Sequence, residues 1–137
     1  MKLSFWVQGR PAAQGSKRHV GNGRMVEASR FVAPWRAAVT AAAIEVAELE
    51  GWQKQSGPMS AHMVFHIARP ASVKESDRPL PIKPPDLDKL VRAVCDSLTD
   101  ADVWEDDAQL VSLTCEKQYV NVGEDGVSIH LKSFEVN

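Results

Sequence analysis

The sequence lacks the features that mark secreted and membrane-spanning chains. Two cysteines, Cys95 and Cys115, are too few for the disulfide framework of a small secreted domain. No hydrophobic run approaches the roughly 18 apolar residues that a transmembrane helix needs. The first ten residues, MKLSFWVQGR, contain no long apolar stretch of the kind found in signal peptides. These absences predict a chain that works in a reduced, cytoplasmic setting without a membrane partner.

The charges of the chain are separated along the sequence. The net charge of -2 says little about partners, but the distribution says more. One acid, Glu27, stands against a group of bases near the N-terminus: Arg10, Lys17, Arg18, Arg24, Arg30 and Arg36. Between Asp86 and Asp125 the balance reverses, and acids outnumber the three bases Lys89, Arg92 and Lys117. One pole suits a polyanion such as nucleic acid, and the other suits metal cations.

Hydrophobic periodicity predicts a small α/β (α+β) fold. Alternating or short apolar runs predict strands at 3–8, 59–68, 108–119 and 126–134, and three- and four-residue steps predict helices at 33–50 and 86–98. The order β-α-β-α-β-β favours a mixed sheet with two helices packed on it. A length of 137 residues suits one domain, 1–137. Two stretches rich in Gly, Pro and charge are expected as loops: a basic loop at 9–30 and a mobile Pro-rich loop at 69–85.

The stretch PPDLDKLVRAVCDSLTDADVWEDDAQ, residues 84–109, gathers carboxylates at two places. Asp86 is expected at the N-cap of the second helix, where an aspartate also serves as an ordinary cap. Asp88, Arg92 and Asp96 follow at i, i+4 and i+8, which is also the pattern of a solvated face with Asp–Arg pairs. If the strand after Asp106 and Asp107 starts beside the helix N-terminus, these carboxylates meet there. Several oxygens around one point suit Mg²⁺ or Mn²⁺.

This stretch closely resembles the signature of the RusA family of Holliday junction resolvases. The family pattern is a D-L-D-N-L helix, then D-A-L, a variable few residues and a W-x-D-D-x-Q turn, matched tightly over about 30 residues. The resemblance is looser over the first 50 residues, where strand, basic loop and helix occur in the expected order. It implies a homodimeric, divalent-metal-dependent endonuclease that cuts four-way DNA junctions by paired symmetric incisions.

The resemblance also implies roles for individual residues. The essential aspartates of the family correspond to Asp86, Asp88 and Asp107, which are expected to hold the metal with Asp106 assisting. A family lysine corresponds to Arg92, which keeps the charge but cannot lose a proton at working pH. The family asparagine is replaced by Lys89, which adds a possible phosphate contact.

Basic residues outside the acidic stretch are expected to contact DNA. Loop bases beside flexible glycines suit phosphate binding without base readout. The DNA-binding candidates are Lys17, Arg18, Arg24, Lys83 and Lys89. His62 and His66 lie roughly 13 Å apart on one strand and cannot chelate one ion together. The two cysteines are expected in the core. No organic cofactor is expected.

Three hypotheses follow from these observations. The first is a metal-dependent, structure-selective endodeoxyribonuclease that resolves Holliday junctions, with Asp86, Asp88, Asp107 and Arg92 as catalytic residues. The second is a non-catalytic protein of the same fold that binds branched DNA, which the Arg92 departure favours. The third is an interaction module whose acidic face is solvated or binds Ca²⁺, against which the basic loop argues.

Overall fold

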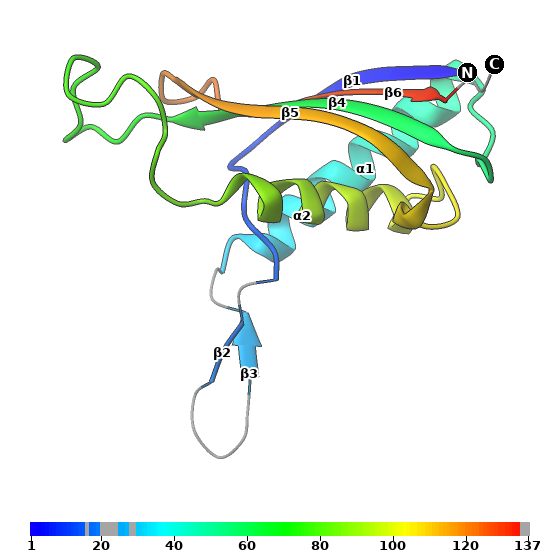
Figure 1. Ribbon diagram of the computed structural model, residues 1–137, viewed down its shortest axis with the longest axis horizontal. Coiled ribbons are helices and arrows are strands. Elements are labelled where there is room, and N and C mark those ends of the chain that lie inside the picture. The colour runs from blue at the N-terminus through cyan, green and yellow to red at the C-terminus, as the bar shows by residue number, and fades with distance from the viewer. Residues whose placement is uncertain (16, 20–24, 28–29, 135–137) are drawn as a thin grey trace.

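The structure is a computed structural model that describes residues 1–15, 17–19, 25–27 and 30–134. Its elements follow the order β-β-β-α-β-α-3₁₀-β-β (Figure 1). The strands and helices are β1 (Lys2–Gln8), β2 (Lys17–His19), β3 (Met25–Glu27), α1 (Val32–Glu50), β4 (Met59–Ala68), α2 (Leu87–Asp100), the 3₁₀ helix η1 (Asp107–Gln109), β5 (Leu110–Val120) and β6 (Gly126–Ser133).

The main sheet has four strands in the order β1-β6-β4-β5. Strand β6 pairs antiparallel with both β1 and β4, while β4 and β5 pair in parallel. Helix α1 connects β1 to β4, and α2 connects β4 to β5, in the same direction across the sheet. Crossovers of one hand and one direction place both helices on the same face. Figure 1 shows both helices on one side of the sheet and an uncovered opposite side.

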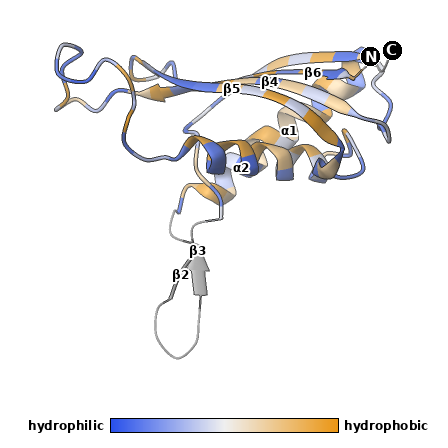
Figure 2. Ribbon diagram, in the orientation of Figure 1, coloured by the Kyte–Doolittle hydropathy of each residue, from blue (hydrophilic) through white to orange (hydrophobic). Residues whose placement is uncertain are grey.

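The hydrophobic core lies between the sheet and the two helices. Alternation along the strands directs Met63 and Phe65 of β4 and Ile129 of β6 toward the helices, and all three side chains are fully buried. Trp35 of α1 and Leu90 of α2 close the core from the other side. Figure 2 shows hydrophobic residues along the facing surfaces of sheet and helices. Because the buried residues form one cluster, the start of α2 is anchored to the same core as the strands.

The predicted mixed sheet with two helices is confirmed, and α2 buries Leu90, Val94 and Leu98 against it. The three- and four-residue apolar steps of the first helix run on to Leu49, but this side chain is 78% exposed, because the fully buried residues of α1 end at Ala43. Within the segment predicted as a basic loop, β2 and β3 pair as a small antiparallel sheet. No helix in the described ranges is long and apolar enough to cross a membrane.

Candidate active site

Asp86 occupies the N-cap position of α2, as expected, directly after Pro84 and Pro85. Its side chain makes no capping hydrogen bond, although aspartate is a preferred N-cap because its carboxylate accepts one. The carboxylate instead lies 3.7 Å from the ammonium group of Lys89, and the Asp86 side chain is 55% exposed. Asp88 follows in the first turn and is also exposed. Two carboxylates are therefore available to solvent at the start of this helix.

Lys117 holds the chain that leads into Asp86. This lysine lies on the helix-facing side of β5, and its ammonium group donates hydrogen bonds to the carbonyl oxygens of Lys83, at 3.0 Å, and Pro85, at 2.8 Å. Hydrogen bonds from a charged donor are stronger than neutral ones. The carbonyl of Pro85 directly precedes Asp86, so Lys117 fixes the backbone from which the first carboxylate projects.

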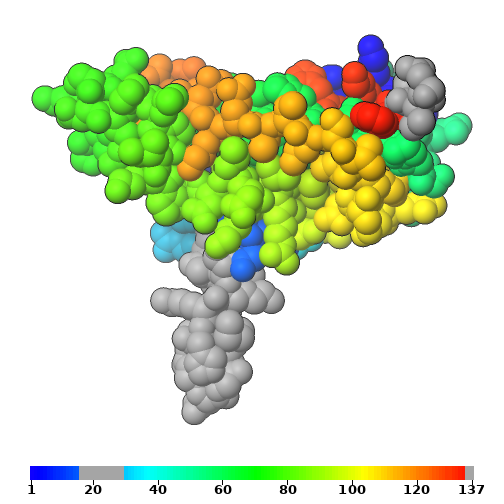
Figure 3. Space-filling view, viewed as in Figure 1, coloured from blue at the N-terminus to red at the C-terminus, as the bar shows by residue number. Residues whose placement is uncertain are grey.

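The Pro-rich segment 69–85 is also tied to β5, through Tyr119. The guanidinium of Arg69 lies 4.3 Å from the centre of the Tyr119 ring, and Arg78 donates a hydrogen bond to the phenolic oxygen at 3.2 Å. Arg69 also donates to the carbonyl oxygens of Arg78 and Pro79 within the segment. Figure 3 shows this segment projecting beyond the sheet next to the start of α2. Its mobility stays a prediction.

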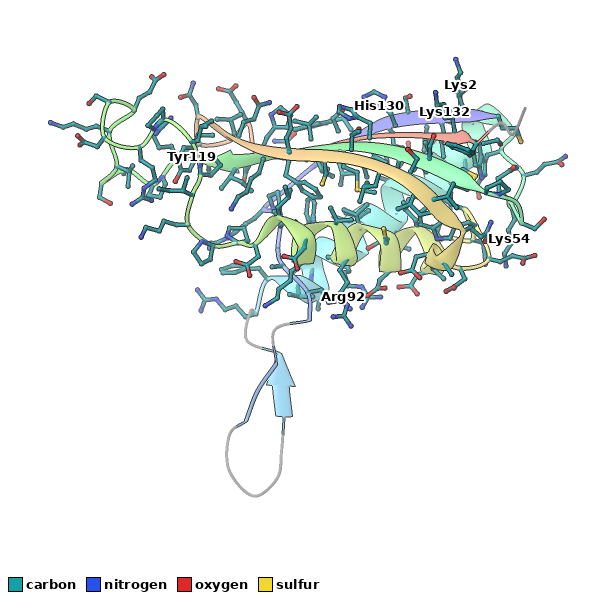
Figure 4. All side chains as sticks on the ribbon, viewed as in Figure 1. Lys2, Lys54, Arg92, Tyr119, His130 and Lys132 are labelled. Carbon is teal, nitrogen blue, oxygen red and sulfur yellow. The ribbon has the colours of Figure 1, made fainter. Side chains whose placement is uncertain are left out.

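The exposed face of α2 lies against the base of the basic segment. The Gln14 amide donates to the Asp96 carboxylate at 2.5 Å, and the Gln14 backbone donates to the Lys89 carbonyl at 3.1 Å. A Cβ atom on Gly15 would lie 2.5 Å from a guanidinium nitrogen of Arg92, so the glycine permits this close approach. Figure 4 shows Arg92 projecting away from the sheet toward β2 and β3.

The second acidic position, Asp106 and Asp107, belongs to a tight turn that hydrogen bonds within the protein hold in place. Asp106 caps η1 by accepting a hydrogen bond from the Ala108 backbone at 3.2 Å. Gln109 accepts from the backbones of Glu105 and Asp106 and donates to the carbonyl oxygens of Gln55 and Gly57. Trp104 is fully buried and donates from its indole nitrogen to Thr99 at 2.8 Å. The W-x-D-D-x-Q turn therefore includes residues with structural roles, and Asp107 is left exposed beside them.

Asp107 lies near the second half of α2 rather than near its start. Burial raises the pKa of the Cys95 thiol to about 12, and the negative charge of Asp107 is the next cause, followed by Asp96 and Cys115. Cys95 is seven residues beyond Asp88, which corresponds to about 10 Å along a helix axis. Because β5 runs back along α2, it begins beside the end of the helix (Figure 1). The condition under which the two acidic positions would meet at the helix N-terminus is therefore not met within this chain.

The described residues of one chain do not assemble a complete metal site. No three carboxylate, imidazole or thiol groups among them lie close enough together to hold one ion. The structure brings Asp86, Asp88, Lys89 and Lys83 to one end of α2, and places Asp106 and Asp107 toward the other. An uncharged thiol at neutral pH makes Cys95 a core residue rather than a ligand.

The predicted DNA-binding residues fall into two groups. Lys83 and Lys89 lie at the start of α2. Lys17 and Arg18 belong to β2, and Arg24 lies outside the described residues. The backbone of β2 pairs with that of β3, a pairing that the Gly-rich sequence did not indicate.

The histidines of the main sheet lie on its uncovered face. His62 contacts Thr114 at 2.5 Å, and His130 contacts Ser4 at 2.9 Å and Ser128 at 3.0 Å. Figure 4 places His130 on the side of the sheet away from the helices. His62 and His130 therefore have hydroxyl partners on this face.

Comparison with known proteins shows which family the chain resembles. A family model described as endodeoxyribonuclease RusA matches residues 8–132. A search of curated proteins finds no significant match. The match runs from the last residue of β1 into β6 and includes both acidic positions and the basic segment. The chain belongs to the RusA endodeoxyribonuclease family.

Proposed function

We propose that this protein is a divalent-metal-dependent endonuclease that resolves Holliday junctions by paired symmetric cuts in four-way DNA. The observation that carries the proposal is the state of the first carboxylate. Asp86 sits at a helix N-cap without making the capping bond, is exposed, and has Asp88 beside it on the first turn. A carboxylate that makes no capping bond, and whose ion pair with Lys89 is long and partly exposed, remains accessible to a ligand.

The residues at the start of α2 fit a Mg²⁺ or Mn²⁺ ion that has few protein ligands. Such ions are often held by one or two carboxylates, with water and substrate phosphate filling the other positions. Asp86 and Asp88 would be these carboxylates. When bound, the metal lowers the pKa of water and offsets charge on phosphate oxygens. A role for Asp107, assisted by Asp106, requires a closer approach than one chain shows, through movement on metal binding or across a dimer.

Positive groups of the chain would orient the DNA strand and stabilise negative charge at the scissile phosphate. Arg92 lies one helical turn beyond Asp88 and would oppose the charge that develops on phosphate during cleavage. Because its guanidinium stays protonated, it acts here as a fixed charge and not as a proton donor. Lys83 and Lys89 would contact backbone phosphates at the same end of the helix.

The basic segment would extend the contact with DNA beyond the cut. Lys17, Arg18 and Arg24 belong to the segment that follows Gln14 and Gly15, which lie against α2. Phosphate contacts of this kind add affinity and salt dependence but carry no direct sequence information. We therefore propose recognition of junction shape with weak sequence preference.

A homodimer would place two cutting sites on one junction. Two-fold symmetry in the protein matches the two-fold symmetry of an open four-way junction. Strand β5 is an edge of the sheet, and it exposes Val111 and Leu113, at 59% and 40%. A long edge strand with exposed apolar residues is a surface on which another chain can pair. We propose β5 as the dimer contact.

The alternative function is binding of branched DNA without cleavage. It rests on the replacement of the family lysine by Arg92, which cannot transfer a proton. Both functions require binding of branched DNA, and only the first includes cleavage of the DNA.

Incubation of purified protein with a synthetic four-way junction separates them. We expect symmetric incisions in Mg²⁺ or Mn²⁺, none in EDTA, and none with Asp86→Asn. Tight junction binding without cutting at any metal concentration would instead establish the alternative. Equal affinity for junction and duplex at low salt would contradict both.

A further inference from the structure

A cavity of about 480 Å³ opens directly beside the start of α2. Pro84 and Pro85, which lead into Asp86, form part of its wall. Most of the rest of the wall comes from the end of β4, the segment after it, and Tyr119 at the end of β5. The residues just after β1 and those between β5 and β6 complete it. Cavities of roughly 300–1,000 Å³ are typical of sites that take a small molecule or part of a larger ligand.

The wall of this cavity is held in place by contacts within the protein. The Arg69 guanidinium stacks on the ring of Tyr119 and donates to the carbonyl oxygens of Arg78 and Pro79. Arg78 in turn donates to the Tyr119 hydroxyl. Lys117 anchors the opposite side through the carbonyl oxygens of Lys83 and Pro85. A site whose groups are fixed in advance loses less entropy when a ligand binds.

The cavity is strongly positive in a chain whose net charge is negative. Its lining includes four cations, Arg10, Arg69, Arg78 and Lys83, against one carboxylate, Asp125. The ion pairs found in the described part of the chain join other residues: Arg36 with Asp100, Lys54 with Asp102, and Lys89 with Asp86. Within that part of the chain, no salt bridge neutralises the four charges of the lining, and the cavity therefore favours an anion.

We infer that this cavity binds a backbone phosphate of the DNA strand next to the position of cleavage. The inference rests on the proposed function and names where the substrate strand is held. Guanidinium groups bind phosphate through directional hydrogen bonds. Arg69 and Arg78 line the cavity, and each guanidinium has more N–H donors than its bonds to the carbonyl oxygens and to Tyr119 use. A phosphate held here would set the register of the strand relative to Asp86.

The test measures junction binding in EDTA over a range of salt concentrations, so that cutting plays no part. Ala71→Trp would fill the cavity from its exposed rim without changing any charge. Ala41→Trp, at an exposed position on α1, is the matched control. Lys83→Gln removes one charge of the lining, and Lys74→Gln removes one from the same segment outside the cavity.

We expect Ala71→Trp and Lys83→Gln each to weaken junction binding by about tenfold. The slope of log affinity against log salt should fall by about 0.9 for each phosphate that the variant no longer binds. The control variants should match the wild type. Wild-type affinity and salt slope in both Ala71→Trp and Lys83→Gln would contradict phosphate binding in the cavity. The proposed function would still stand. A wild-type protein that binds no DNA would overturn both.

Discussion

The two ends of helix α2 carry the same residue type in different surroundings. At its end, Asp100 pairs with Arg36 at 2.7 Å and Asp102 with Lys54 at 3.2 Å. At its start, Asp86 has a longer contact of 3.7 Å with Lys89, and a cavity lined by several cations lies beside it. Figure 4 shows Lys54 and Tyr119, which mark these regions, at opposite ends of the molecule.

This difference shows that the number of carboxylates in a stretch does not identify a site. The aspartates at the end of α2 are neutralised by exposed partners, in pairs that typically contribute about 1 kcal/mol or less. At the start, the ion pair recorded among the described residues is the longer one between Lys89 and Asp86, and four cations line the neighbouring cavity. The exposed Asp86 carboxylate and the cavity cations, which form no salt bridge within the described part of the chain, are placed to meet a metal ion and phosphate.

The largest expected effect concerns stability at the end of α2. Trp104 is fully buried, and its indole bonds to Thr99. Replacing it with Ala should lower the free energy of unfolding by about 3–5 kcal/mol, because it leaves a large cavity. Urea unfolding measures this loss. Trp6→Ala, at a side chain that is 44% exposed, should cost clearly less, and equal losses would contradict the structural role of this end.

The next effect concerns catalysis on the exposed face of the helix. Arg92→Ala should slow junction cutting by about 100-fold, the magnitude seen when a group that stabilises transition-state charge is removed. Junction binding in EDTA should change far less. Arg92→Lys restores a positive charge and should recover part of the rate. Cutting by Arg92→Ala at the wild-type rate would remove Arg92 from the mechanism.

A smaller effect on the cutting rate is expected when the hydrogen bonds from Lys117 to the backbone before Asp86 are removed. Lys117→Met deletes both hydrogen bonds to the carbonyl oxygens of Lys83 and Pro85. We expect about tenfold slower cutting at limiting Mg²⁺, since loss of a bond from a charged donor costs about 1.5–3 kcal/mol. Higher Mg²⁺ should recover part of the rate. Lys132→Met, on the uncovered face of the sheet, is the control and should leave the Mg²⁺ dependence unchanged.

The smallest effect is expected from the exposed ion pair between Arg36 and Asp100. Arg36→Gln should change the free energy of unfolding by roughly 1 kcal/mol or less, because surface ion pairs contribute little. Thermal unfolding at low and high salt gives the measurement. A loss of several kcal/mol would show that this pair is more than a surface contact.

Most of the fold could be predicted from periodicity, because each core element has one clear apolar pattern. The predicted strand at 59–68 coincides with β4, and the predicted helix at 86–98 lies within one or two residues of α2. The position of Asp107 could not be predicted in the same way. It depends on where β5 begins relative to α2, which is set by the direction of the crossover and not by local sequence.

Parts of the candidate site could not be predicted from the sequence. In the sequence, Lys117 looks like any basic residue of a strand. Its role follows only from its hydrogen bonds to two carbonyl groups. Gln109 belongs to the W-x-D-D-x-Q motif, but its hydrogen bonds to Gln55 and Gly57 join segments about fifty residues apart. Asp86 could be placed at the N-cap from Pro84 and Pro85, whereas its missing capping bond could not.

The most direct test compares one aspartate from each end of α2 under single-turnover conditions. Asp88→Asn and Asp100→Asn make the same chemical change, and cutting of a four-way junction in Mg²⁺ is measured for both. We expect a loss of about 1,000-fold or more for Asp88→Asn, because metal binding contributes several kcal/mol to such reactions, and a rate near wild type for Asp100→Asn. Equal rates for the two variants would contradict the assignment of the start of α2 as the active site.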